Sequence, residues 1–349
     1  MLPLQSLTFV IIIKMEEMFA YPNDHIVTVG VMQYHGLCLS GLSEQQLRRA
    51  KDKTNKFRFN SAFGASPAVL CSIYEDLSNS TAFDDEHDPP RPMRLKASKI
   101  NFKWFLRTLL YLRKYPTEDD FERNLNINIH HGRDKIWDMV RRIQLLQFIK
   151  ITWPDDLGGN NIWIMSVDGT HCWIAEPGHP NFSQDSEYYS HKFNKAGINY
   201  ELGIALATGK LIWMNGPFKA GRNDLNIFTG EGLEERLRIL GKKSLGDGGY
   251  AGHHKTVSSP NAHDSYQVKR FKSRGLKRQE DFNGMTKVFK ILSGRFRHPL
   301  HKFPVAFEAV CVICQYKIES DEPLYDILVE DLLNEPEEDL YDEIGMALL

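Results

Sequence analysis

The sequence has too few cysteines for a disulfide-stabilised protein. Five cysteines in 349 residues, odd in number and scattered, argue against a disulfide framework and for a reducing compartment. Cys311 and Cys314 have the spacing of a zinc-binding pair, but no second pair completes such a site. We therefore expect these two cysteines to be core residues on one helix.

The sequence also lacks a hydrophobic run long enough to cross a membrane. Leu7–Ile13 is too short, and it has neither the basic start nor the small-residue cleavage site of a secretory signal. We therefore predict no membrane association. Residues 1–20 are treated as an N-terminal extension, for which a weak signal peptide, a strand or a misplaced start of the coding region remain alternatives.

Each of two segments near the C-terminus is nearly devoid of charge of one sign. Residues 269–302 hold eleven Lys or Arg against two acids, whereas residues 319–349 hold twelve acids and no Lys or Arg. The basic segment favours a polyanionic partner, with a solvated face as the alternative. The acidic tail is expected to be partly disordered.

The length allows about two domains, and the first half reads as helical. Apolar residues recur at helical spacing through residues 101–146, with a short break at Asn126–Gly132. Three helices with a tight turn before a basic last one resemble a helix-turn-helix, in which Arg133 and Lys135 would contact DNA. An ordinary helical domain packed on the second half is an equally weighted alternative.

After a linker at Trp153–Asn161 the pattern changes to alternating strands and helices. Thr208-Gly209 is a predicted turn, so the two strands that flank it are expected to form an antiparallel meander with the first. The predicted strands are Ile162–Val167, Tyr200–Ala207, Leu211–Met214 and Lys243–Leu245, and the predicted later helices are Lys277–Leu292 and Pro304–Ile318.

Two of these strands run into an acid followed by glycine, at Asp168-Gly169 and Asp247-Gly248. If the strands are neighbours, the two carboxylates lie side by side at one edge of the sheet, where they repel unless one is protonated or a cation lies between them. Carboxylate oxygens suit Mg²⁺ or Mn²⁺. Glu280, on a helix within the basic segment, is a candidate third ligand. The alternative reading of each strand-end aspartate is an ordinary turn former, which is the more common role of such a residue.

Five short blocks, taken in order, resemble the signature blocks of DDE-superfamily transposases, most closely the Harbinger and IS5-like branch of eukaryotic genomes. The blocks are Val167–His171, Gly216–Asp224, Leu245–Gly252, Arg278–Asn283 and Gly294–His298.

The resemblance implies an α/β catalytic core of RNase H-like type, a mixed sheet with helices, over residues 160–318. An all-α, helix-turn-helix-like domain over residues 21–152 would precede it, and an acidic tail over residues 319–349 would follow. The implied activity is cutting and joining of DNA strands at transposon ends in the nucleus, with two Mg²⁺ or Mn²⁺ ions as cofactors. A homodimer or a helper DNA-binding protein would complete the assembly.

By the family pattern, Asp168, Asp247 and Glu280 correspond to the metal-binding and catalytic triad. Asp281 is a less favoured choice for the third acid. Some family members place the glutamate in line with Thr286, which is no carboxylate, and the Arg-x-Glu-x-x-Asn variant of the pattern favours Glu280 followed by Asn283.

Other polar residues receive supporting roles. His171 and Asn283 are expected to hydrogen-bond to the metal ligands or to phosphate. Asp224 is expected to cap a helix rather than to bind metal. A histidine metal site built from His171, His179 and His191 matches no usual ligand spacing. The predicted DNA-contacting residues are Arg278, Lys287, Lys290, Arg295, Arg297, Arg133 and Lys135.

Two hypotheses compete with an active transposase. The chain is alternatively a non-catalytic nuclear DNA-binding protein derived from one, although all three predicted acids are present. A third reading is an interaction module whose acidic tail docks a basic partner or folds back on the basic segment.

Overall fold

The structure is a computed structural model that describes residues 27–79, 100–125, 127–155, 161–178, 185–250, 252–320 and 322–327. The predictions made for residues 1–20, for His179 and for most of the acidic tail lie outside these ranges. The described residues form two compact units. Unit 1 comprises 27–149, 289–291 and 305–320, and unit 2 comprises 150–288, 292–304 and 322–327.

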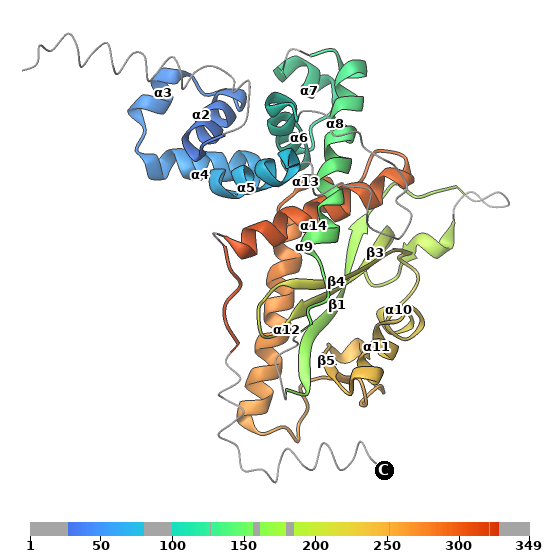
Figure 1. The fold of residues 1–349 in the computed structure, drawn as a ribbon. Helices are drawn as coiled ribbons and strands as arrows, with labels where there is room; N and C mark the ends of the chain where they lie inside the picture. The colour runs from blue at the N-terminus through green and yellow to red at the C-terminus, as the bar shows by residue number, and fades with distance from the viewer. Residues whose placement is uncertain are drawn as a thin grey trace, which may run out of the picture. The chain divides into compact units, whose positions relative to one another are not determined.

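Unit 1 is helical, as the sequence predicts (Figure 1). Ser66 caps α5 by accepting a hydrogen bond from the Val69 amide at 3.2 Å, with Pro67 as the first helical residue. The three helices expected over residues 101–146 are α6, α7 and α8. The helices of this unit are α2 Val29–Leu39, α3 Glu44–Arg49, α4 Asp52–Phe63, α5 Pro67–Ser78, α6 Phe102–Lys114, α7 Glu118–Leu125, α8 Ile129–Leu145 and α14 Phe303–Glu319. Two short helices, α9 Gln147–Lys150 and α13 Lys290–Ser293, begin in unit 1 and end in unit 2.

Most of helix α14 belongs to unit 1, although the sequence places it in the predicted catalytic range 160–318. Its central residues, 309–314, are all fully buried, and a helix that is apolar all round needs neighbours on every side. Glu308 accepts hydrogen bonds from Gln144 at 2.5 Å and Gln147 at 2.8 Å. The prediction that Cys311 and Cys314 are core residues of one helix is confirmed.

Unit 2 contains a mixed six-strand sheet with the order β2-β3-β1-β5-β6, in which β4 also pairs with β3. The predicted antiparallel meander is confirmed, because β3 pairs antiparallel with both β1 and β4. Strands β5 and β6 add to β1 in parallel. The strands are β1 Trp163–Trp173, β2 Tyr189–Ser190, β3 Lys195–Ala205, β4 Leu211–Lys219, β5 Lys243–Leu245 and β6 Val257–Ser258.

Strand β1 is longer than predicted. The sequence suggests an end at Val167, but the strand continues through Asp168-Gly169 to Trp173, which pairs with Gly197. The antiparallel partner β3 supplies hydrogen bonds along this whole length, so the acid–glycine step does not end the strand. What ends near Asp168 is the parallel partner β5, whose last residue is Leu245.

Helices cover both faces of this sheet (Figure 1). Helix α12, Tyr266–Lys287, lies on one face, and α10, Asp224–Gly230, and α11, Leu233–Leu240, lie on the other. Gly275 allows the close approach of α12 to β5, because a Cβ there would lie 2.5 Å from Leu245 Cδ1. No helix in the described ranges of the chain has the length and apolarity to cross a lipid bilayer.

Candidate active site

The structure brings Asp168 and Asp247 to the same edge of the sheet. Strands β1 and β5 are parallel with Ser166 opposite Leu245, and each aspartate follows two residues later. The carboxyl ends of parallel neighbours share one edge, so the condition set by the sequence, that these strands be adjacent, is met.

Asp168 is held from two sides. Its Oδ2 accepts a hydrogen bond from Asn283 Nδ2 of α12 at 2.9 Å, and its carboxylate also accepts one from the Gly169 amide. Burial, together with the charges of Asp224 and Asp247, raises the pKa of Asp168 to about 7. A carboxylate with these surroundings is either protonated or neutralised by a cation.

Asp247 is arranged differently. It is exposed, and its Oδ1 accepts a hydrogen bond from the Gly249 amide at 2.8 Å. This is the turn-forming role that the sequence offers as the ordinary reading of such a residue. Its charge nevertheless acts on Asp168 and Asp224, so the turn also places the carboxylate within the electrostatic reach of both.

The structure corrects the expectation that Asp224 caps a helix. Asn223 caps α10 by accepting from the Asn226 amide at 2.8 Å, and Asp224 is the first helical residue. The Asp224 carboxylate lies against Gly169, where an added Cβ would be 2.1 Å from Asp224 Oδ1. Burial raises the pKa of Asp224, and Asp247 adds to this effect. Asp224 is therefore a third acid beside Asp168 and Asp247.

Sequence reasoning missed a buried acid on the same side of the sheet as Asp224. Glu201 is opposite Gly169 on β3, and burial raises its pKa to about 7 although Trp213 Nε1 donates a hydrogen bond to its Oε2 at 2.8 Å. Glu201 Oε1 and the buried Tyr250 hydroxyl have no hydrogen-bond partner. Burial, together with the charges of Asp224, Glu201, Asp168 and Asp247, raises the pKa of Tyr250, so its hydroxyl stays protonated. The only sequence signal for Glu201 was its place in the predicted strand, where residues alternate between the two faces of the sheet.

Glu280 does not join these acids. Its side chain is 68% exposed and pairs with Lys277 at 3.3 Å. The helix phase explains this, because the residues of α12 that meet β1 are Gln279, which accepts from Ser166 at 2.9 Å, and Asn283 one turn later. Asp281 also pairs with Lys277, at 3.2 Å, and Thr286 is fully buried. The third acid whose charge acts on Asp168 is therefore Asp224 and not Glu280.

His171 lies on the opposite face of β1 from Asp168, since the two are three residues apart on one strand. Its ring stacks on Phe193 with centroids 4.5 Å apart, and it fills the space beside Gly197. Burial, with Lys287 and Lys195 nearby, lowers the pKa of His171 to about 4, so it is neutral near pH 7. The expected contact of His171 with the metal ligands or a phosphate is not observed.

Two of the predicted DNA-contacting residues have structural roles instead. Arg278 is 1% exposed, and its Nη2 donates to the carbonyls of Ala205 at 2.7 Å and Leu206 at 2.8 Å, where β3 ends. The half-buried Lys287 donates to the carbonyl of His171 at 2.5 Å. Lys272 is likewise buried and pairs with Asp264 at 2.8 Å, so the basic segment is not one solvated or DNA-facing surface.

The remaining predicted DNA contacts are on the surface. Arg295 and Arg297 are exposed in unit 2, and Lys135 and Lys290 are exposed in unit 1. Arg133 is partly exposed and forms two hydrogen bonds with Glu118, at 2.9 and 2.6 Å, which a phosphate would have to replace.

The first residues of the acidic tail pack on α12. Arg274 Nη2 donates to the Asp326 carbonyl at 2.6 Å, the Tyr325 hydroxyl donates to the Arg274 carbonyl at 2.7 Å, and Ile327 is buried in an apolar cluster with Phe271. The tail thus begins by folding back on the basic helix through its backbone and apolar side chains.

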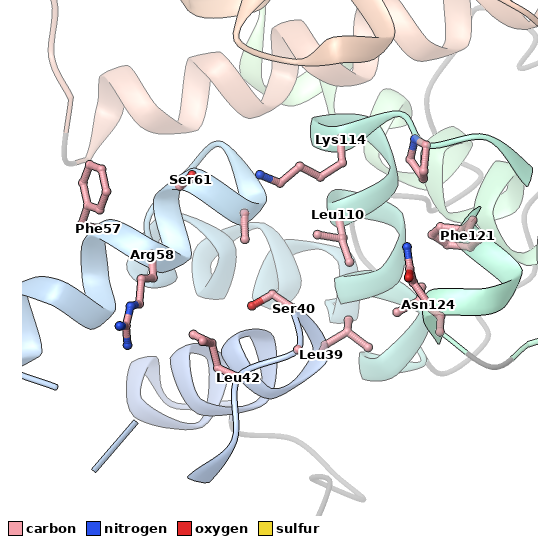
Figure 2. A pocket seen from close by; sticks show the side chains of 14 residues that line it. Leu39, Ser40, Leu42, Phe57, Arg58, Ser61, Leu110, Lys114, Phe121 and Asn124 are labelled. Carbon is pink, nitrogen blue, oxygen red and sulfur yellow. The ribbon is translucent and has the colours of Figure 1, made fainter. Parts of the chain in front are cut away.

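Unit 1 has a pocket of about 570 Å³ between α4 and the α6–α7 pair, in which the Lys114 side chain extends toward α4 (Figure 2). Its lining is largely apolar, with Arg58 and Lys114 as cations and no carboxylate among the described residues. It offers no acid or base pair for catalysis, so the acids at the edge of the sheet remain the candidate active site.

Among the described residues, no group of three or more His, Cys, Asp or Glu side chains is placed to hold a metal ion as it stands. Comparisons with protein-family models, curated proteins and solved structures found no match for this chain.

Proposed function

We propose that this chain is a divalent-metal-dependent DNA nuclease or transposase of RNase H-like type that cuts and joins phosphodiester bonds. The observation that carries the proposal is the parallel register of β1 and β5, which puts Asp168 and Asp247 at one sheet edge. Asn283 of α12 adds a hydrogen bond that fixes the Asp168 carboxylate. The mixed sheet with helices on both faces supports the fold implied by the sequence resemblance.

The acids fit a hard divalent cation by their chemistry. Asp168, Asp247 and Asp224 offer carboxylate oxygens, and positive charge would offset the burial and the repulsion by Asp224 and Asp247 that raise the pKa of Asp168. We propose Asp224 as the third carboxylate in place of Glu280. Bound Mg²⁺ or Mn²⁺ would supply Lewis acidity and lower the pKa of a coordinated water or 3′-hydroxyl.

Residues of the chain have distinct parts in this proposal. Asn283 and the Gly169 amide orient the Asp168 carboxylate. Tyr250, with its hydroxyl protonated and unpartnered, is a donor available beside the acids. Lys192, whose charge lowers the pKa of both Asp168 and Asp224, provides a cation near the site for an incoming phosphate.

The test is nicking and strand joining of DNA that carries the ends of the chain's own element, in Mg²⁺ or Mn²⁺. Asp168→Asn and Asp224→Asn are expected to abolish both reactions, whereas Glu280→Gln keeps them. If the wild-type chain and Asp168→Asn behave identically, the nuclease proposal is wrong. If Glu280→Gln is inactive and Asp224→Asn is active, the assignment of the third acid is wrong while the function stands.

A second candidate is a DNA-binding protein that descends from a transposase and no longer cuts. The observations that favour it are the solvent-facing Glu280 and the absence, within the described residues, of a ready three-ligand metal site. Sequence-specific DNA binding that persists in an Asp168→Ala, Asp247→Ala double variant, with no cleavage by the wild-type chain, would decide for this candidate.

A further inference from the structure

An exposed group of aromatic and basic side chains lies where β1 and β3 continue beyond Asp168. We name it the Trp173 platform; it comprises Trp173, Phe193, Lys192, Lys195 and Arg295. Trp173 is 39% exposed and Phe193 is 45% exposed, and what sets these two rings apart from single exposed apolar residues is that each lies beside cations.

The cations of the platform lie against its rings. Lys195 Nζ is 5.2 Å from the Trp173 ring centroid, and the Arg295 guanidinium carbon is 5.9 Å from it. Lys192 Nζ is 5.6 Å from the Phe193 ring centroid. These distances are within the range of cation–π attraction, so positive charge is held next to each exposed ring.

Backbone pairing and stacking fix the platform in place. Trp173 is the last residue of β1 and pairs with Gly197 of β3. The Phe296 amide donates to the Trp173 carbonyl at 2.9 Å, and the bridge between Ile174 and Phe296 brings Arg295 beside Trp173. Phe193 stacks on the ring of His171, which is itself packed beside Gly197. Trp173 is therefore mounted on the sheet, and Phe193, in the turn between β2 and β3, is held by its stacking on His171.

We propose that the Trp173 platform binds unpaired nucleotides of a DNA strand, with bases stacked on Trp173 and Phe193 and phosphates held by Lys192, Lys195 and Arg295. Stacked aromatics beside a basic track are the arrangement that single strands require, because every base has a face that stacks and every linkage carries a charge. A duplex hides those faces, and an acidic peptide would engage the cations while leaving the rings unused.

The inference rests on the proposed action on DNA and adds the strandedness of the substrate. Asp168 is five residues before Trp173 on β1, roughly 16 Å along an extended strand, and the odd spacing puts their side chains on opposite faces of the strand. Trp173 shares its face with Gly169, against which the Asp224 carboxylate lies, so the platform is on the Asp224 side of the sheet. Nucleotides on the platform would therefore flank a phosphodiester at the acids instead of occupying the same place. This separation lets binding to the platform be tested with cleavage switched off.

The experiment measures binding of the full chain to a labelled single-stranded oligonucleotide and to the matching duplex, by fluorescence anisotropy in EDTA. Trp173→Ala and, separately, Phe193→Ala are expected to weaken single-strand binding by about tenfold or more and duplex binding by less than about twofold. Trp173→Phe should retain most of the affinity. Arg295→Ala should weaken both and reduce the salt dependence by about one phosphate contact.

Tyr266→Ala is the matched control, because Tyr266 is 78% exposed on unit 2 but lies at the start of α12. The inference is overturned if Trp173→Ala and Tyr266→Ala weaken single-strand binding equally. It is also overturned if Trp173→Ala weakens single-strand and duplex binding equally, or if a glutamate-rich peptide binds more tightly than the oligonucleotide. Because EDTA removes catalysis, a chain that binds single strands through Trp173 but never cuts DNA keeps the platform and loses only the nuclease proposal. A chain that binds no DNA loses both.

Discussion

The two acid–glycine steps of unit 2 look alike in the sequence and differ in the structure. Asp168-Gly169 lies inside the long strand β1, where the acid is partly buried and the glycine leaves room for the Asp224 carboxylate. Asp247-Gly248 lies in an exposed turn after β5, where the acid bonds the Gly249 amide and nothing lies within 4 Å of a Cβ added at Gly248. The same dipeptide therefore makes room for a neighbouring side chain within β1 and forms a turn after β5.

This difference shows where the chemistry of the candidate site is set. Asp168 has a raised pKa because burial and two neighbouring acids disfavour its charge, whereas Asp247 contributes charge from a position that water reaches. Asp168, the less exposed member of the pair, is the one whose charged form is disfavoured by its surroundings. Its surroundings, rather than the acid–glycine motif, distinguish a candidate ligand from a turn residue.

The largest contrast is expected between Gly169→Ala and Gly248→Ala. The first adds a methyl group 2.1 Å from Asp224 Oδ1, so the carboxylate or the strand must move. A displacement of about 1 Å at a catalytic group costs on the order of a hundredfold in rate, and we expect a loss of that size in metal-dependent DNA nicking. Thermal unfolding should also show a lower midpoint for Gly169→Ala.

Gly248→Ala serves as the control for this pair, because the added methyl meets open space and Gly248 has no positive backbone φ. Its nicking rate and unfolding midpoint should match the wild type. Comparable losses in the two variants would show that the acid–glycine steps are equivalent after all.

A smaller contrast is expected in the pH dependence of stability without metal. The pKa of Asp168 is about 7 in the folded state against an ordinary 3.8, so the folded state binds the proton more tightly. The stabilisation from this proton is complete below about pH 4 and is lost as the pH rises to about 7, a change on the order of 4 kcal/mol. Asp168→Asn should flatten this part of the profile, measured by urea unfolding in EDTA.

Asp247→Asn should leave most of that slope, because the largest cause of the Asp168 shift is burial and not the charge of Asp247. Glu201, with a pKa also raised to about 7, contributes a parallel loss over the same range in every variant. A profile that Asp168→Asn leaves unchanged would contradict the buried, repelled state of this acid.

The smallest contrast is between Asn283→Ala and Glu280→Gln on α12. Removing the Asn283 amide deletes the hydrogen bond to Asp168 and leaves a less fixed carboxylate, with an expected 10–100-fold loss of Mn²⁺ affinity, as for residues that support metal ligands. Calorimetric titration with Mn²⁺ measures it. Glu280→Gln removes only an exposed pair with Lys277 and should change stability by less than about 0.5 kcal/mol and Mn²⁺ affinity by less than about twofold. The reverse order of effects would restore Glu280 as the third ligand.

Sequence patterns predicted the elements of unit 2 better than their limits. The antiparallel meander was expected from the strand patterns and the Thr208-Gly209 turn, and it is present. The adjacency of β1 and β5 was only a condition for bringing Asp168 and Asp247 together, and the parallel pairing of these strands meets it. The end of β1 was predicted too early, since an acid and a glycine interrupt an apolar run without interrupting its pairing to β3. Helix α12 begins at Tyr266, before the predicted Lys277, because its first turns are polar and carry little apolar periodicity.

Local sequence determined the chemistry that is available: acids after apolar strands, a basic helix, an acidic tail and the aromatic residues at the end of β1. Only the tertiary structure decided which of these meet. Helix phase turned Glu280 to solvent and Asn283 to Asp168, and the covering of both sheet faces buried Arg278 and brought Asp224 to Gly169. The reason is that period and capping act within a few residues, whereas burial, pKa and ligand sets arise from contacts between strands and helices far apart in the chain.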